Sequence, residues 1–213
     1  FRYKKYLMLI INKDQFKIGD LNINTNQILK SVNDTNKYLF DLSMQFKNLN
    51  IDFIESLGNR NLSGTIGEIF KYFLVSEFKM FKMNPHSDGY PDVIFLNNED
   101  KLKLYKNGFN YIEGKKIPLK QSFSPFKGGG IEIKCTMGTL KSNNKNKLIK
   151  KEISRIDRLS NLSYSAHHRH DINLLALYID FYEEKNFTPQ ILSVFFSKIL
   201  ISDWAQMSLG TSN

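Results

Sequence analysis

GIEIKC at residues 130–135, together with PDVIFL at residues 91–96, decides the fold of this chain. Successive side chains of a strand point to opposite faces of a sheet, so Glu132 and Lys134 share one face and their apolar neighbours share the other. After Asp92 the second stretch is apolar throughout, which is typical of a strand covered on both faces. The two stretches therefore predict buried strands of an α/β fold that carry acidic residues.

These acidic residues match the chemistry of phosphodiester hydrolysis. If the two strands are neighbours, Asp92 and Glu132 can share one divalent cation, and Mg²⁺ takes carboxylate oxygens while it keeps several waters. Such a cation can lower the pKa of a bound water and offset charge on a phosphate, with Lys134 placed to orient or activate that water. Each of these residues, taken by itself, could instead have a purely structural role. Asp92 could cap a turn after Pro91, and Glu132 with Lys134 could form a surface pair.

Pro91-Asp92 followed by Glu132-Ile133-Lys134 resembles the motif of the PD-(D/E)XK nuclease superfamily, which includes most type II restriction endonucleases. The resemblance covers roughly residues 62–182. It implies a restriction-endonuclease-like α/β core of order αβββαβ, in which helices flank a mixed central sheet.

The same resemblance implies roles for individual residues. Asp92, Glu132 and the carbonyl of Ile133 would bind Mg²⁺, Lys134 would act on the attacking water, and Glu68, on the first core helix, would assist. A helix-dipole role for Glu68, near the predicted start of its helix, remains equally open.

Length and composition bound the class of protein. The chain has 213 residues, 41% of them hydrophobic, which fits one globular domain spanning residues 1–213. No stretch reaches the apolar length of a membrane span, so we expect no membrane association. One cysteine, Cys135, excludes an internal disulfide or a multi-cysteine zinc site and fits a reducing bacterial cytoplasm. The formal net charge of +9 favours a polyanionic partner, and we expect double-stranded DNA.

Two helices are predicted in the first part of the chain. Apolar residues recur at helical spacing over residues 26–50, within a mainly helical extension at residues 1–60. This apolar stripe fits packing on the chain's own core or the interface of a homodimer, because many restriction enzymes cut palindromes as symmetric dimers. A second helix, over residues 62–79, opens the predicted catalytic core at residues 62–200.

An insertion at residues 98–128 separates the two motifs and has a hairpin pattern. Charged and apolar residues alternate over residues 101–105 and again over 109–112, and Lys106-Asn107-Gly108 between them predicts a turn. Lysines interleave with aromatic residues here, and they could follow a DNA backbone or merely cover a sheet edge. The predicted DNA-binding lysines are Lys101, Lys103, Lys106, Lys115 and Lys116.

The last part of the chain predicts a helix from about Lys145 to Asn161 and strands at residues 172–182 and 190–198. The loop before the first of these strands contains His168 and Arg169. We expect this loop to contact phosphates or base edges, with Arg169 able to grip guanine, although a plain surface loop is equally consistent.

The pattern as a whole predicts a Mg²⁺-dependent type II restriction endonuclease, part of a restriction-modification system, that cuts both strands of a specific duplex and leaves 5′-phosphate ends. Two alternatives stay open. One is a structure-specific repair or junction-resolving nuclease of the same superfamily. The other is a non-catalytic basic DNA-binding module.

Overall fold

The computed structural model describes residues 15–18, 21–142, 148–152, 172–182 and 188–200. In chain order its elements are β1 Gln15–Ile18, β2 Leu21–Asn24, α1 Thr25–Asn48, α2 Phe53–Glu77, β3 Phe81–Met83, β4 Val93–Phe95, α3 Glu99–Lys106, β5 Phe109–Ile112, β6 Lys115–Pro118, α4 Lys120–Phe123, β7 Gly130–Met137, β8 Thr139–Ser142, β9 Leu148–Glu152, β10 Ile172–Tyr182 and β11 Thr188–Ile199.

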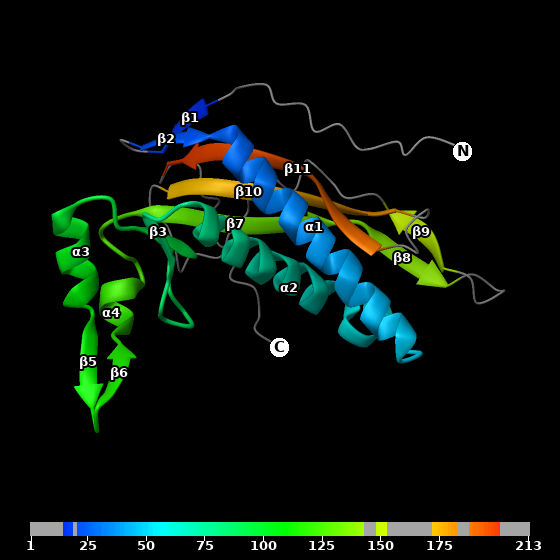
Figure 1. Ribbon diagram of the computed structural model, residues 1–213, viewed down its shortest axis with the longest axis horizontal. Coiled ribbons are helices and arrows are strands. Elements are labelled where there is room, and N and C mark those ends of the chain that lie inside the picture. Colours follow the sequence, from blue (N-terminus) through cyan, green and yellow to red (C-terminus); the bar gives the residue numbers. More distant parts are fainter. Residues whose placement is uncertain (1–14, 19–20, 143–147, 153–171, 183–187, 201–213) are drawn as a thin grey trace, which may run out of the picture.

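A mixed five-stranded sheet forms the centre of the protein, in the order β11-β10-β7-β4-β3. Strands β3, β4 and β7 pair antiparallel, β10 lies parallel to β7, and β11 returns antiparallel at the edge. Helices α1 and α2 lie together across one face of this sheet (Figure 1). The predicted α/β class with a mixed sheet is therefore confirmed, as are the strands predicted at residues 172–182 and 190–198.

The two faces of β7 differ as its sequence predicts. Ile131 and Ile133 are buried in the main core, which the sheet shares with α1 and α2. In β10, Leu174 and Ala176 pair in register with Glu132 and Lys134 and belong to a separate cluster. The acidic and basic side chains of β7 therefore lie on the sheet face opposite the two long helices.

Helix α1 matches the helix predicted over residues 26–50, and its apolar stripe packs against α2 and β11. Ile28, Val32 and Leu39 are fully or almost fully buried. The Asn36 side chain donates to the carbonyl of Ile191 at 3.0 Å and accepts from its N–H at 2.8 Å. The apolar stripe of α1 thus packs on the chain's own core, and Asn36 satisfies backbone groups of the edge strand.

Helix α2 begins nine residues before the predicted start at Leu62, because the Asp52 side chain caps the N–H groups of Ile54 and Glu55 at 2.8 Å. Gly58, with φ 67°, interrupts the helix. Glu68 consequently lies in the middle of the helix. The expectation that it lies near a helix start was wrong, and the helix dipole does not account for it.

The insertion between the motifs contains a helix where the first strand of a hairpin was predicted. Residues 99–106 form α3, since the Asn98 side chain accepts from the N–H of Lys101 at 3.0 Å and acidic residues occupy the first turn. The hairpin lies farther along, as β5 and β6, and turns at Glu113-Gly114, which have φ values of 50° and 75°. The chain does turn at residues 107–108, as predicted, but this turn joins α3 to β5 and does not connect two strands of a hairpin.

A second correction concerns the segment after β7. Residues 148–152, predicted as helix, form strand β9, which pairs antiparallel with β8. The apolar pair Leu148-Ile149 fits either element, and the neighbouring strand supplies hydrogen bonds that the sequence pattern does not reveal. The rest of the predicted helix, residues 153–161, lies outside the described residues.

Within the part of the chain that the structure describes, no helix is long and apolar enough to cross a membrane.

The packing of α2 on the sheet gives a first prediction. Phe70 is fully buried and Tyr72, two residues later, is 65% exposed. We expect Phe70→Ala to lower the free energy of unfolding by about 3–5 kcal/mol, because it leaves a cavity in the core, and the matched Tyr72→Ala to lower it by less than about 1 kcal/mol. Urea denaturation of both variants measures this difference, and similar losses for the two would contradict the described packing.

Candidate active site

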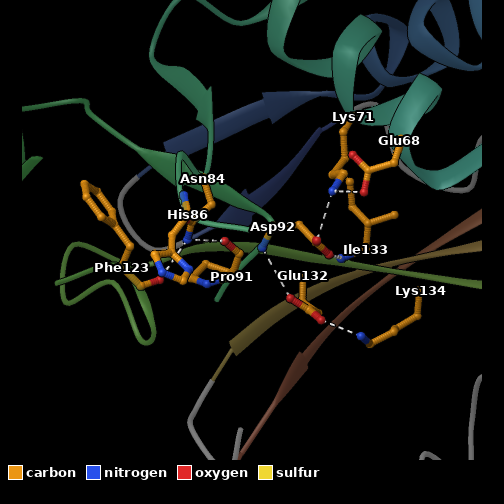
Figure 2. Close-up of polar contacts among 10 residues, drawn as sticks. All are labelled: Glu68, Lys71, Asn84, His86, Pro91, Asp92, Phe123, Glu132, Ile133 and Lys134. Atoms are coloured by element: carbon orange, nitrogen blue, oxygen red, sulfur yellow. Dashed lines mark hydrogen bonds and ion pairs between the residues drawn. The ribbon is translucent and has the colours of Figure 1, made fainter. Parts of the chain in front are cut away.

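Asp92 directly precedes β4 and lies beside Glu132 because β4 and β7 pair antiparallel, with Val93 opposite Ile131. The N–H of Asp92 donates to Oε2 of Glu132 at 3.3 Å. Its own carboxylate accepts from the N–H of Ile133 at 2.8 Å through Oδ2. The structure thus brings together the acidic residues of the two motifs, as Figure 2 shows.

Close pairing of these strands requires a glycine. A Cβ at Gly130 would lie 2.0 Å from the carbonyl oxygen of Val93, a distance that real contacts do not reach. Gly130 therefore permits the approach of β4 to β7 that sets Asp92 beside Glu132.

Glu132 and Lys134 form an ion pair on their shared face of β7, with Nζ 2.5 Å from Oε1. The Glu132 side chain is 7% exposed and that of Lys134 is 38% exposed. Burial and the nearby Asp92 charge raise the pKa of Glu132 to about 7, although Lys134 pulls it down. Near neutral pH this carboxyl is therefore poised between its acid and its base forms.

A second lysine, Lys71 of α2, contacts Asp92 from the helical side of the sheet. Its Nζ lies 3.2 Å from Oδ1 of Asp92 and 2.6 Å from Oε1 of Glu68, one helical turn earlier (Figure 2). Burial pushes the pKa of Lys71 down, but the Asp92 and Glu68 carboxylates outweigh burial and the pKa is raised. Lys71 therefore stays charged and links Glu68 to Asp92.

The sequence reasoning did not select Lys71. Its signal was the spacing of three residues from Glu68 on a predicted helix, which places two side chains on one helix face. The same spacing is common in lysine-rich helices, so it identifies a pair without indicating that the pair reaches Asp92.

Asn84, also missed, holds the loop that delivers Asp92. Its Nδ2 donates to the carbonyls of Pro91 at 3.0 Å and Phe123 at 2.9 Å, and its backbone N–H donates to the carbonyl of Asp92 at 2.9 Å. A Cβ at Gly89 would lie 2.1 Å from the Asn84 side chain. The loop thus closes around this amide, and Pro91-Asp92 is fixed at both of its carbonyls.

The oxygen donors at the site fit a hard divalent cation with an incomplete set of protein ligands. Asp92 and Glu132 offer carboxylates and the predicted third donor is the carbonyl of Ile133, so water would supply the rest, as Mg²⁺ prefers. Among the described residues no three Asp, Glu, His or Cys side chains converge as a metal site. Glu68, 63% exposed and paired with Lys71, is therefore not brought into a three-carboxylate group with Asp92 and Glu132.

Cys135 lies on the helical face of β7, where a Cβ at Gly67 of α2 would be 3.4 Å from its Sγ. Burial, together with the Asp92 charge, raises the pKa of this thiol to about 12. The thiol is protonated at neutral pH and serves to pack α2 against the sheet.

The predicted DNA-binding lysines of the insertion lie apart from the site, on the module formed by α3, β5, β6 and α4, which projects to one side of the sheet (Figure 1). Lys103, Lys106 and Lys115 are exposed. Lys101 is half-buried, with Nζ 2.8 Å from Oδ1 of Asn97, and Lys116 lies over the Phe109 ring at 3.9 Å. His168 and Arg169 lie outside the described residues.

No family model, no curated protein and no solved structure matches this chain.

The buried Glu132 predicts a pH-dependent stability. Its pKa is about 7 in the folded chain and ordinarily 4.5, so between these values the folded state binds more protons than the unfolded state. We expect the free energy of unfolding to fall as the pH rises through this window, by about 3 kcal/mol at about 1.36 kcal/mol per pKa unit. Glu132→Gln removes this contribution.

Urea denaturation at about pH 5 and about pH 8 measures the effect as the difference between wild type and Glu132→Gln. An identical pH dependence in the two proteins would show that Glu132 titrates normally.

Proposed function

We propose that this chain is a Mg²⁺-dependent endonuclease of the PD-(D/E)XK type, and that it acts as a type II restriction endonuclease on double-stranded DNA. The observation that carries the proposal is the side-by-side arrangement of Asp92 with Glu132 and Lys134, on paired strands of a mixed sheet. The order of α2, β3, β4 and β7, followed by β10 parallel to β7, agrees with the αβββαβ core that the resemblance implies. Of the helix expected before β10, residues 148–152 instead form strand β9, and residues 153–161 lie outside the described residues.

The site residues would have two different roles in hydrolysis, metal binding and activation of the attacking water. Asp92, Glu132 and the carbonyl of Ile133 would hold Mg²⁺, which supplies Lewis-acid assistance to the attacking water and to the scissile phosphate. Lys134, the more exposed partner of its ion pair, orients the water and takes part in its deprotonation.

The reaction adds the water oxygen to phosphorus and breaks the bond from phosphorus to the 3′ oxygen, which takes up a proton. The products are a 5′-phosphate and a 3′-hydroxyl. A restriction enzyme performs this step once in each strand, which a homodimer bound to a palindrome achieves by symmetry.

The insertion module supplies a surface suited to duplex DNA. At the tip of the β5–β6 hairpin, Lys115 and Lys116 pair in register with Ile112 and Tyr111, and all four side chains are exposed. Positive charge with amphipathic side chains on a projecting ribbon fits backbone contact beside a groove. Together with the formal net charge of +9, this module favours a nucleic acid over a small-molecule substrate.

Cleavage of plasmid and of linear genomic DNA with Mg²⁺ tests the proposed activity. We expect discrete fragments from wild type and losses of at least about 100-fold in Asp92→Asn and Lys134→Met, because each removes a group that acts on the reacting atoms. Lys79→Met, at an exposed lysine that follows α2, is the matched control and should retain full activity.

Full cleavage by Asp92→Asn would refute the nuclease assignment. Cutting confined to branched DNA would replace restriction with junction resolution, and binding without cleavage would favour the non-catalytic module.

The insertion lysines give a separate prediction on binding. Measured by fluorescence anisotropy on duplex DNA without divalent cations, Lys106→Ala/Lys115→Ala should flatten the slope of log affinity against log salt by about 0.9 for each phosphate contact removed. The control is Lys37→Ala/Lys47→Ala on α1, which removes the same charge from the helical layer. Its slope should stay close to that of wild type and therefore be steeper than that of the insertion variant. Equal slopes for the two double variants would argue against the insertion as a DNA surface.

A further inference from the structure

If the site bound two divalent cations, the first would lie between Asp92 and Glu132, and the second would lie between Asp92 and Glu68. Both carboxylates face this place, one from α2 and one from the start of β4, and each is directed at it through one oxygen, Oε1 and Oδ1 respectively. In enzymes that cut phosphodiesters with two metals, the ions share a carboxylate and stand about 3.5–4 Å apart. Asp92 is in the position to be such a shared ligand.

The ammonium group of Lys71 fills this place. It lies 2.6 Å from Glu68 and 3.2 Å from Asp92. Mg²⁺ binds carboxylate oxygens at about 2.0–2.1 Å, so an ion shared by these two oxygens would need the volume that the nitrogen occupies.

Lys71 is also held against displacement. Its side chain is only 12% exposed, and its ammonium group contacts carboxylates from two different elements, Glu68 of α2 and Asp92 before β4. Moving the ammonium away would leave a charged group without partners in a partly buried place, which is strongly unfavourable. Lys134, by comparison, is 38% exposed and lies on the other face of the sheet.

We propose that Lys71 serves as a built-in substitute for the second cation, so that the site binds one divalent cation, between Asp92 and Glu132, and excludes another between Glu68 and Asp92. The inference rests on the proposed function, because it assumes a divalent cation at Asp92 and Glu132. It assigns Lys71 as a positioning residue that holds Asp92 and balances its charge from the helical side. Glu68 then acts through Lys71 and contacts no metal.

The inference predicts the number of ions bound. Counted by electron paramagnetic resonance of free Mn²⁺ and checked by calorimetry, wild type should bind about one Mn²⁺ per chain. Lys71→Met keeps most of the aliphatic stem and removes the charge, so it should bind about two. Lys71→Gln is a second variant of the same design, for use if the methionine variant does not fold as judged by circular dichroism.

Two controls separate this gain from a general change in charge. Lys71→Met/Glu68→Gln should return to about one Mn²⁺ per chain, because the second cation would then lose the Glu68 carboxylate as a ligand. Lys71→Arg keeps the positive charge and should remain at about one.

Two Mn²⁺ per wild-type chain, or no additional ion in the folded Lys71 variants, would overturn the inference. The same measurements distinguish failure of this inference from failure of the proposed function. If wild type binds one ion and Asp92→Asn binds none, the metal site of the proposed nuclease stands whatever the Lys71 variants do. If wild type binds no Mn²⁺, the proposed metal site and the inference fall together.

Discussion

The antiparallel pairing of β4 with β7 is the constraint on which the rest of the site depends. It places Val93 opposite Ile131 and Ile94 opposite Gly130, so Asp92, the residue before β4, is held beside Glu132 near the start of β7. The absence of a side chain at Gly130 lets the strands approach, and the backbone N–H groups of Asp92 and Ile133 then exchange hydrogen bonds with the opposite carboxylates. A shift of one residue in this register would reverse the faces of β4 relative to β7 and separate the two acidic groups.

Buried charge at the site is balanced by lysines from both faces of the sheet. Lys134 neutralises Glu132 on one face, and Lys71 neutralises Asp92 on the other. The pKa of Glu132 is raised first by burial and then by the nearby charge of Asp92, so the two carboxylates still disfavour one another's ionised forms despite these partners. The divalent cation that we propose between them would relieve this repulsion.

The sequence predicted the parts of this structure that local periodicity specifies. The alternation of residues 130–135 fixed the faces of β7, and the apolar stripe of α1 gave that helix almost to its ends. The pattern failed where two elements fit equally well: residues 101–105 alternate as a strand would, yet the Asn98 cap and the charges of the terminal turns favour a helix. Lys71 and Asn84 could not be found, because their importance comes from contacts with residues 21 and 39 positions away, which no local pattern encodes.

These long-range contacts also connect the insertion to the site. The carbonyl of Phe123 in α4 accepts from the Asn84 side chain and from the N–H of Tyr90, and the N–H of Phe126 donates to the carbonyl of Tyr90. Phe123 is itself fully buried in a cluster that joins Ile94 of β4 to the aromatic rings of the insertion. The loop that carries Asp92 and the module that carries the exposed lysines are therefore one hydrogen-bonded and packed unit. A partner that displaced the module would act directly on the backbone that holds Asp92 beside Glu132.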